Sequence, residues 1–163
     1  MAESTRTGSF EEFVLARSAS LYRTAYLMTG RRAEAEDLLQ TALIKLYVAW
    51  PRASIVAAPE AYARRVLVNT FISGRRPARF TRERLVRIPP DLAVDDPDLD
   101  DRLTLWPLVV SLPPRQRAVI VLRYYGGLSE SEIAHALRCA PGTVKSTASA
   151  ALRSLRMLMG ELR

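Results

Sequence analysis

The sequence predicts an all-α protein in which a charged, flexible linker joins two small helical domains. Three observations predict this fold class. Apolar residues recur at helical rather than alternating spacing, proline and glycine are scarce inside the long segments, and opposite charge blocks interrupt the middle of the chain. From these features we expect a first domain over residues 1–78, a linker over 79–98 and a second domain over 99–163.

The first domain is expected to begin with two long helices. Ser9 and Glu12 have the spacing of a capping box, which predicts the start of a helix that ends near Met28. A second helix is expected over 33–50, because leucines recur there on one face and Pro51 follows. Both helices therefore have one apolar side that can pack into a common core.

Charge separates the third helix from the second domain. That helix is expected over 60–74, within a stretch (60–90) that contains eight arginines and two glutamates. Residues 91–101 then contain six aspartates and no basic residue. Blocks of like charge rarely pack into a core, so the linker at 79–98 is placed where they meet.

The second domain is expected to contain a helix that runs from Pro113–Pro114 to about Tyr125, followed by a helix-turn-helix over 128–156. Ser129 and Glu132 form a second capping box at the start of its first helix. We expect the break between its two helices to lie at Arg138 to Gly142, because proline and glycine do not continue a regular helix.

Three features favour DNA recognition by this helix-turn-helix over an ordinary helical hairpin. Ala134 is small, as the close crossing of two helices requires, and Val144 is placed to fill the angle between them. The opposite face of the second helix carries short hydrogen-bonding side chains suited to a major groove. These side chains are Thr143, Lys145, Ser146, Thr147 and Ser149.

Composition restricts the classes of function. The net charge of +7 and the pI of about 10.2 favour a polyanionic partner, either nucleic acid or an anionic membrane surface. A single cysteine, Cys139, and a single histidine, His135, exclude an internal disulfide and a Cys/His metal site. No catalytic or phosphate-binding motif is present, so we expect a non-enzymatic protein without cofactor or metal. The N-terminus has no apolar signal region, which predicts a cytoplasmic protein.

Four motifs in order resemble the extracytoplasmic-function (ECF) sigma factors of the sigma-70 family. The resemblance covers nearly the whole chain, and the four together are far more specific than any one alone. The matching segments are 36–40 for region 2.2, 59–69 with Arg75–Arg76 for regions 2.3 to 2.4, 112–124 for the start of region 4, and 127–156 for region 4.2.

The resemblance implies a role in transcription initiation and assigns residues to it. A face of the second helix would dock on core RNA polymerase, through Asp37, Gln40 and Thr41. The third helix and the residues after it would melt and read the minus-ten promoter element, through Arg64, Arg65, Asn69, Arg75 and Arg76. The helix-turn-helix would read the minus-thirty-five element through the polar face described above. The implied partners are core polymerase, promoter DNA and an anti-sigma factor, with no small-molecule substrate.

Two other classes remain open at the level of sequence. An autonomous helix-turn-helix regulator would bind duplex DNA tightly without polymerase, usually as a dimer on a palindrome. A basic helical adaptor would bind only proteins, and it would not need the polar face from Thr143 to Ser149. Binding of duplex DNA by the isolated chain discriminates among them.

Overall fold

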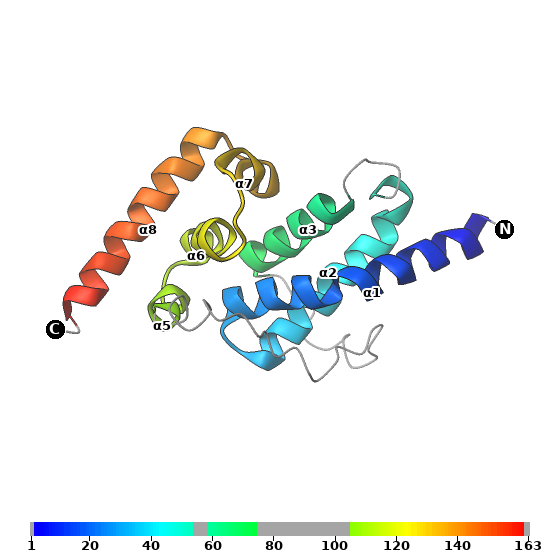
Figure 1. The fold of residues 1–163 in the computed structure, drawn as a ribbon, viewed down its shortest axis with the longest axis horizontal. Helices are drawn as coiled ribbons and strands as arrows, with labels where there is room; N and C mark the ends of the chain where they lie inside the picture. Colours follow the sequence, from blue (N-terminus) through cyan, green and yellow to red (C-terminus); the bar gives the residue numbers. More distant parts are fainter. Residues whose placement is uncertain (1, 54–58, 75–104, 162–163) are drawn as a thin grey trace.

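The computed structural model describes residues 2–53, 59–74 and 105–161, apart from the side chains of residues 2–8 and 53 (Figure 1). Every regular element in these ranges is a helix, which confirms the all-α class. The linker predicted at 79–98 lies outside the described residues, as do Arg75 and Arg76. The helices form two units, α1 to α3 and α5 to α8.

The first unit is a three-helix bundle. Its helices are α1 (Ala2–Thr29), α2 (Arg32–Ala53) and α3 (Pro59–Ser73). They pack through apolar faces, as the sequence predicts, and Trp50 is a core residue at 2% exposure. The Phe10 ring packs edge to face against the Trp50 ring, with the two ring centroids 5.5 Å apart.

Two predicted helix boundaries in this unit are wrong. Ser9 lies inside α1 rather than at its N-cap, because the helix already begins at Ala2. A side chain within a helix cannot cap it, since capping requires a non-helical backbone at that residue. Pro51 lies inside α2, which continues to Ala53. The proline removes one helical hydrogen bond, and only two further helical residues follow it.

The second unit begins with short helices. They are α5 (Trp106–Val110), α6 (Pro114–Ile120) and a π-helical turn, η2 (Val121–Tyr125), that continues α6. The sequence predicts a single regular helix over the last two. The wider turn is visible at its end, where the Gly126 N–H donates to the Val121 carbonyl, five residues earlier.

The helix-turn-helix consists of α7 (Glu130–Leu137) and α8 (Pro141–Glu161). The capping box of α7 is confirmed, but the predicted break is too long. Pro141 is the first residue of α8, because the first helical position needs no N–H and suits the fixed φ of proline. The reversal is therefore confined to the residues after Leu137, and it passes through Arg138 in the left-handed conformation (φ 53°).

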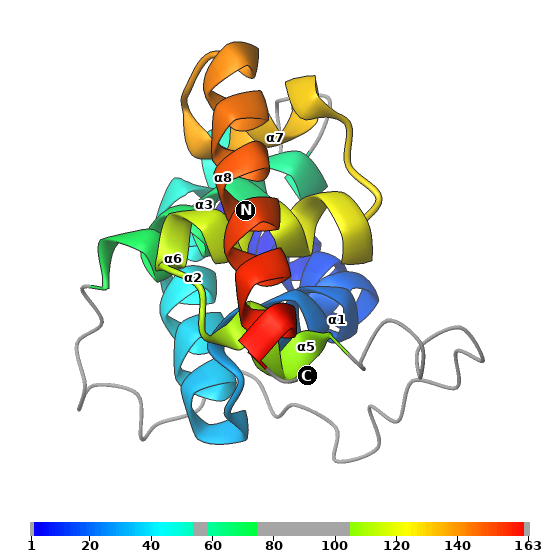
Figure 2. The ribbon, with the colours of Figure 1, turned by 90° about the vertical axis from the view of Figure 1, so that its left-hand side faces the viewer.

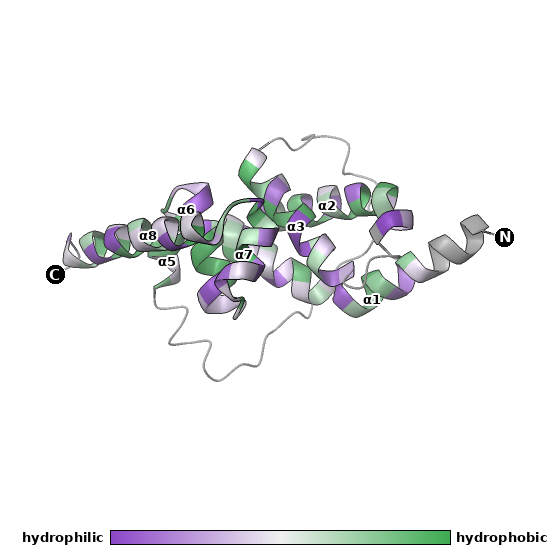
Figure 3. Ribbon diagram, turned by 90° about the horizontal axis from the view of Figure 1, so that it is seen from above, coloured by the Kyte–Doolittle hydropathy of each residue, from purple (hydrophilic) through white to green (hydrophobic). Residues whose placement is uncertain are grey.

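The two units pack directly against each other. α7 and α6 lie on α3, while α5 and η2 contact α1 (Figure 1). α8 runs across α5, α6 and α7 on the side away from the first unit (Figures 1 and 2). Hydrophobic and hydrophilic residues alternate along the helices (Figure 3), and the buried apolar residues of both units form one continuous cluster. We call the contact between the units the seam.

The left-handed backbone at Arg138 leads to a stability prediction. Replacing Arg138 by glycine is expected to stabilise the protein by about 0.5–1 kcal/mol, because glycine adopts positive φ without steric cost. Arg153 is also exposed but lies within α8, so glycine there is expected to destabilise the protein by about 1 kcal/mol. Urea unfolding of both variants measures the difference, and destabilisation by Arg138→Gly would contradict the prediction.

Candidate nucleic-acid interface

The start of α7 fixes the first half of the helix-turn-helix. The Glu132 N–H donates to the Ser129 hydroxyl, and the Ser129 N–H donates to the Glu132 carboxylate, both at 3.2 Å. These hydrogen bonds, led by the one from the Ser129 backbone, lower the pKa of the Glu132 carboxyl. The carboxylate is therefore ionised at neutral pH, as the capping box requires.

The two helices cross where the sequence predicts. Ala134 and Val144 are both buried, at 5% and 0% exposure. The Cys139 N–H donates to the Ala134 carbonyl at 3.0 Å, which closes the end of α7. Ala148, Ala151 and Leu155 continue the buried face of α8. These contacts fix which side of α8 faces outward.

The predicted polar face of α8 lies on that outward side. Thr143, Lys145, Ser146 and Ser149 are exposed, and Thr147 is half-buried. The Ser146 hydroxyl donates to the Thr143 carbonyl at 3.0 Å. Short polar side chains on the first turns of an exposed helix are suited to hydrogen bonds with base edges and phosphates.

A carboxylate lies beside this face. Glu130 forms an ion pair with Arg123 at 2.8 Å and accepts a longer contact from Lys145 at 3.8 Å. The ion pair between Glu130 and Arg123 joins α7 to η2. Lys145 is exposed and only loosely paired, so its ammonium is available to an incoming phosphate or base.

The candidate minus-ten residues on α3 lie at the seam instead. Arg64, Arg65 and Asn69 are all half-buried. The Arg64 guanidinium is 3.9 Å from Glu60 on its own helix, and the Arg65 Nε is buried without a hydrogen-bond partner among the described residues. A buried donor without a partner is costly, so this arrangement leaves Arg65 under-satisfied.

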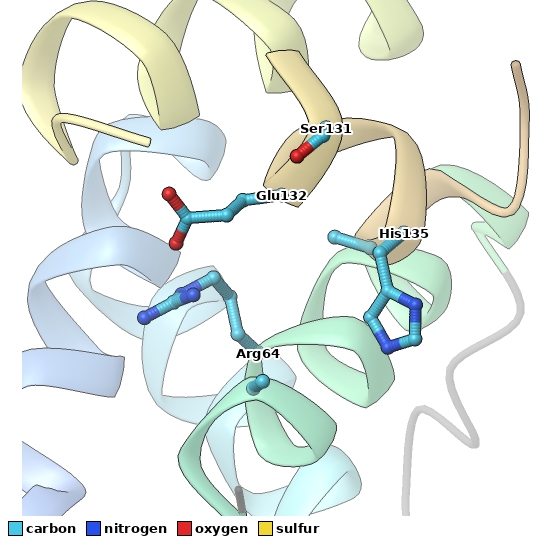
Figure 4. Close-up of a pocket in the computed structure, with 6 residues that line it drawn as sticks. Arg64, Ser131, Glu132 and His135 are labelled. Atoms are coloured by element: carbon cyan, nitrogen blue, oxygen red, sulfur yellow. The ribbon is translucent and has the colours of Figure 1, made fainter. Parts of the chain in front are cut away.

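Arg64 borders a cavity between the two units (Figure 4). The cavity has a volume of about 230 Å³ and is lined by residues of α3 and α7. Ser131, Glu132 and His135 face it from α7, and Arg64 faces it from α3 (Figure 4). The first helix of the helix-turn-helix thus lies directly over the basic side of α3.

The candidate polymerase-binding residues on α2 differ in exposure. Asp37 is half-buried, whereas Gln40 and Thr41 are buried at 6% and 3%. The Thr41 hydroxyl has no hydrogen-bond partner among the described residues. Contact with a protein through Gln40 or Thr41 therefore requires that these side chains become uncovered.

Two exposed apolar residues extend the same side of α2. Ile44 and Val48 follow Asp37 by seven and eleven residues, which places all three on one helix face. Ile44 and Val48 are 37% and 77% exposed. The sequence prediction missed them because it sought polar residues, although their spacing from Asp37 was a usable signal. We call Asp37, Ile44 and Val48 the docking stripe.

The described residues contain no group of three or more metal-ligating side chains. None of the helices in the described part of the chain is long and apolar enough to span a membrane. An exposed polar recognition helix, a capped first helix and a tight reversal between them define a helix-turn-helix DNA-binding protein.

Comparison with known proteins identifies the family. The family model of sigma-70 region 2 matches residues 13–81, and the family model of sigma-70 region 4 matches residues 103–155. The chain is 40% identical to the RNA polymerase sigma-E factor of Streptomyces avermitilis over 149 residues, covering 90% of this chain and 83% of that protein. It is 34% identical to the ECF RNA polymerase sigma factor SigL of Mycobacterium tuberculosis, covering 89% and 85%.

A solved structure shares the fold. It is a co-crystal structure of the sigma factor RpoE with the anti-sigma factor NepR from Bartonella quintana. The match has a TM-score of 0.66 at 26% identity and covers 95% of this chain and 99% of the matched chain. The chain belongs to the sigma-70 family, in its ECF branch.

Proposed function

We propose that the chain binds core RNA polymerase and directs it to promoters, where it recognises two elements and initiates transcription. The observation that carries this proposal is the combination, in one chain of the sigma-70 family, of an exposed recognition face on α8 with a second basic helix, α3. The face of α8 reads the minus-thirty-five element. α3, with Arg75 and Arg76 beyond it, binds the minus-ten element.

The test is run-off transcription with core polymerase on a library of upstream regions. We expect transcripts to start at a small set of promoters only when the protein is added. Fluorescence anisotropy at physiological salt provides a second measurement, and we expect the isolated chain to bind duplex DNA weakly. Nanomolar, sequence-specific binding by the free chain would instead indicate an autonomous regulator.

Docking on polymerase is assigned to the docking stripe on α2. Large apolar side chains that protrude into solvent beside a carboxylate are typical of protein-binding surfaces. Gln40 and Thr41 remain part of the proposed site, as residues that contact polymerase only after their buried side chains become exposed. We also propose an anti-sigma factor as a partner, which is supported by the co-crystal structure of RpoE with NepR.

Val48 tests the apolar part of the docking stripe. Val48→Asp is expected to weaken binding of core polymerase at least tenfold, or about 1.4 kcal/mol, because it places a charge in an apolar contact. The unfolding free energy should change by less than about 0.5 kcal/mol, since Val48 is 77% exposed.

Leu15→Asp is the matched control for that variant, because Leu15 is 82% exposed but lies on α1. It introduces the same charge into a similarly exposed apolar position. Equal losses of polymerase binding by the two variants, measured by biolayer interferometry, would remove Val48 from the interface.

A further inference from the structure

The carboxylate of Glu130 faces two cations from different helices of the second unit. The Arg123 Nη1–H donates to its Oε1 at 2.8 Å, and the Lys145 Nζ lies 3.8 Å from its Oε2. Arg123 belongs to η2, Glu130 is the first residue of α7, and Lys145 lies in the second turn of α8. One negative charge therefore lies between the two helices of the helix-turn-helix and the element before them.

The two contacts of this carboxylate differ in strength. The contact between Arg123 and Glu130 is a charge-assisted hydrogen bond between two half-buried residues. The Arg123 guanidinium carbon also lies 5.8 Å from the centroid of the Tyr124 ring, which restricts its movement. By contrast, the Lys145 side chain is 69% exposed, and its 3.8 Å contact is longer than a hydrogen bond. Arg123 therefore anchors the carboxylate, whereas Lys145 is able to turn toward DNA.

These charges lie where a helix-turn-helix meets the DNA backbone. In this motif the second helix enters the major groove, and the first helix crosses the phosphates. Glu130 begins that first helix, and its carboxylate is close to Lys145 on the recognition face. A phosphate that approaches the Lys145 ammonium therefore also approaches a fixed negative charge.

The carboxylate affects the two kinds of DNA contact differently. Contacts with phosphates carry no sequence information, whereas contacts with base edges specify the sequence. A lysine ammonium has three donors, so Lys145 can donate to a neutral base edge while it remains beside Glu130. A phosphate oxygen is charged, and Glu130 repels it at the same position. The carboxylate thus penalises a phosphate contact of Lys145 but not a base contact.

We propose that Glu130 is a specificity-determining residue of the recognition face, because its carboxylate, anchored by Arg123, directs Lys145 to base edges rather than to phosphates. The proposal rests on the assignment of α8 to the minus-thirty-five element under the proposed function. Glu130 weakens binding to unmatched DNA, where phosphate contacts dominate, more than binding to the matched element. It acts through Lys145 and is therefore a positioning residue.

The test compares Glu130→Gln with Glu161→Gln in the full chain. Both variants remove one negative charge, but Glu161 is exposed at the end of α8, about 24 Å along the helix from Lys145. Glutamine at 130 keeps an oxygen that can accept from Arg123, so mainly the charge is lost. Fluorescence anisotropy measures the binding of a labelled random-sequence duplex between about 0.05 and 0.2 M salt.

We expect Glu130→Gln to tighten binding of the random duplex and to steepen the slope of log K against log salt by about 0.9, the value for one additional phosphate contact. Its gain in affinity over the parent should therefore be about threefold larger at the lowest salt than at the highest. Glu161→Gln should keep the slope of the parent, as should Glu130→Asp, which retains the charge. Loosening of the helix-turn-helix would weaken binding instead, so the direction of the change separates the two causes.

Lys145→Ala tests whether the effect passes through the lysine. In that background, Glu130→Gln should leave the salt slope unchanged, because the ammonium that gains the phosphate contact is absent. Run-off transcription then compares a promoter selected from the library with the same promoter carrying a scrambled minus-thirty-five element. The preference for the intact promoter should fall about threefold or more in Glu130→Gln but not in Glu161→Gln.

Three results would overturn the proposal: equal salt slopes in Glu130→Gln and Glu161→Gln, a steeper slope that persists without Lys145, or an unchanged promoter preference. Circular dichroism establishes that each variant is folded. If Glu130→Gln is not, Glu130→Ala takes its place and must give the same changes. The duplex measurements contain no polymerase, so a failure of the parent protein in run-off transcription is a separate result that contradicts the proposed function.

Discussion

Replacing Asp37 by arginine is expected to abolish most binding of core RNA polymerase while the protein remains folded. Asp37 is half-buried and lies on the docking stripe, about two helical turns before Ile44. Reversal of charge at an interface both removes an attraction and creates a repulsion, which typically costs several kcal/mol. We expect a loss in affinity of at least tenfold, or about 1.4 kcal/mol.

The control for Asp37→Arg is Glu11→Arg, which makes the same change in charge on the exposed side of α1. Circular dichroism and thermal melting establish that both variants are folded. Co-purification with tagged core enzyme measures binding. If Asp37→Arg and Glu11→Arg retain the enzyme equally, Asp37 does not belong to the docking stripe.

The second large effect is expected on the recognition face of α8. Lys145→Ala combined with Ser146→Ala should reduce transcription from a minus-thirty-five-dependent promoter at least tenfold, because a good base contact contributes about 1–3 kcal/mol. Binding of core polymerase should be nearly unchanged, since both side chains point away from the buried Val144 and Ala148.

Arg156→Ala supplies the matched control for the recognition face. It removes one positive charge from an exposed position on α8, about 16 Å farther along the helix from Lys145. Run-off yield and polymerase affinity are measured for both variants. A parallel loss of polymerase binding in the Lys145/Ser146 variant would show that this face contacts protein rather than DNA.

The parts of the fold that depend on local chemistry could be predicted from the sequence. The Ser129–Glu132 capping box joins residues three apart, and the burial of Ala134 and Val144 follows from helical period and size. The boundaries at Ser9 and Pro51 were wrong because the spacing of a capping box also occurs inside a helix, and because a proline close to a helix end is tolerated. α5 is too short to give a periodic signal.

The candidate site was predicted less completely than the fold, for a physical reason. The assignment of Asp37, Gln40 and Thr41 to one helix face did not reveal that the last two are buried, because burial depends on what covers the face. The hydrogen bonds across the seam join Trp106 and Arg117 to backbone carbonyls 79 and 89 residues away. A carbonyl is present at every residue, so no residue type marks such an acceptor in the sequence.

The seam joins two parts of one chain, and this sets how strong it has to be. Contacts within a chain act at an effective concentration that reaches the millimolar range. A contact with an intrinsic dissociation constant near 0.1 mM, weak for separate proteins, would then keep about nine molecules in ten closed. The free energy needed to separate such a seam is only about 1.4 kcal/mol, a small fraction of the binding free energy of a nanomolar partner. The individual contacts of the seam can therefore be weak and still keep the two units together within one chain.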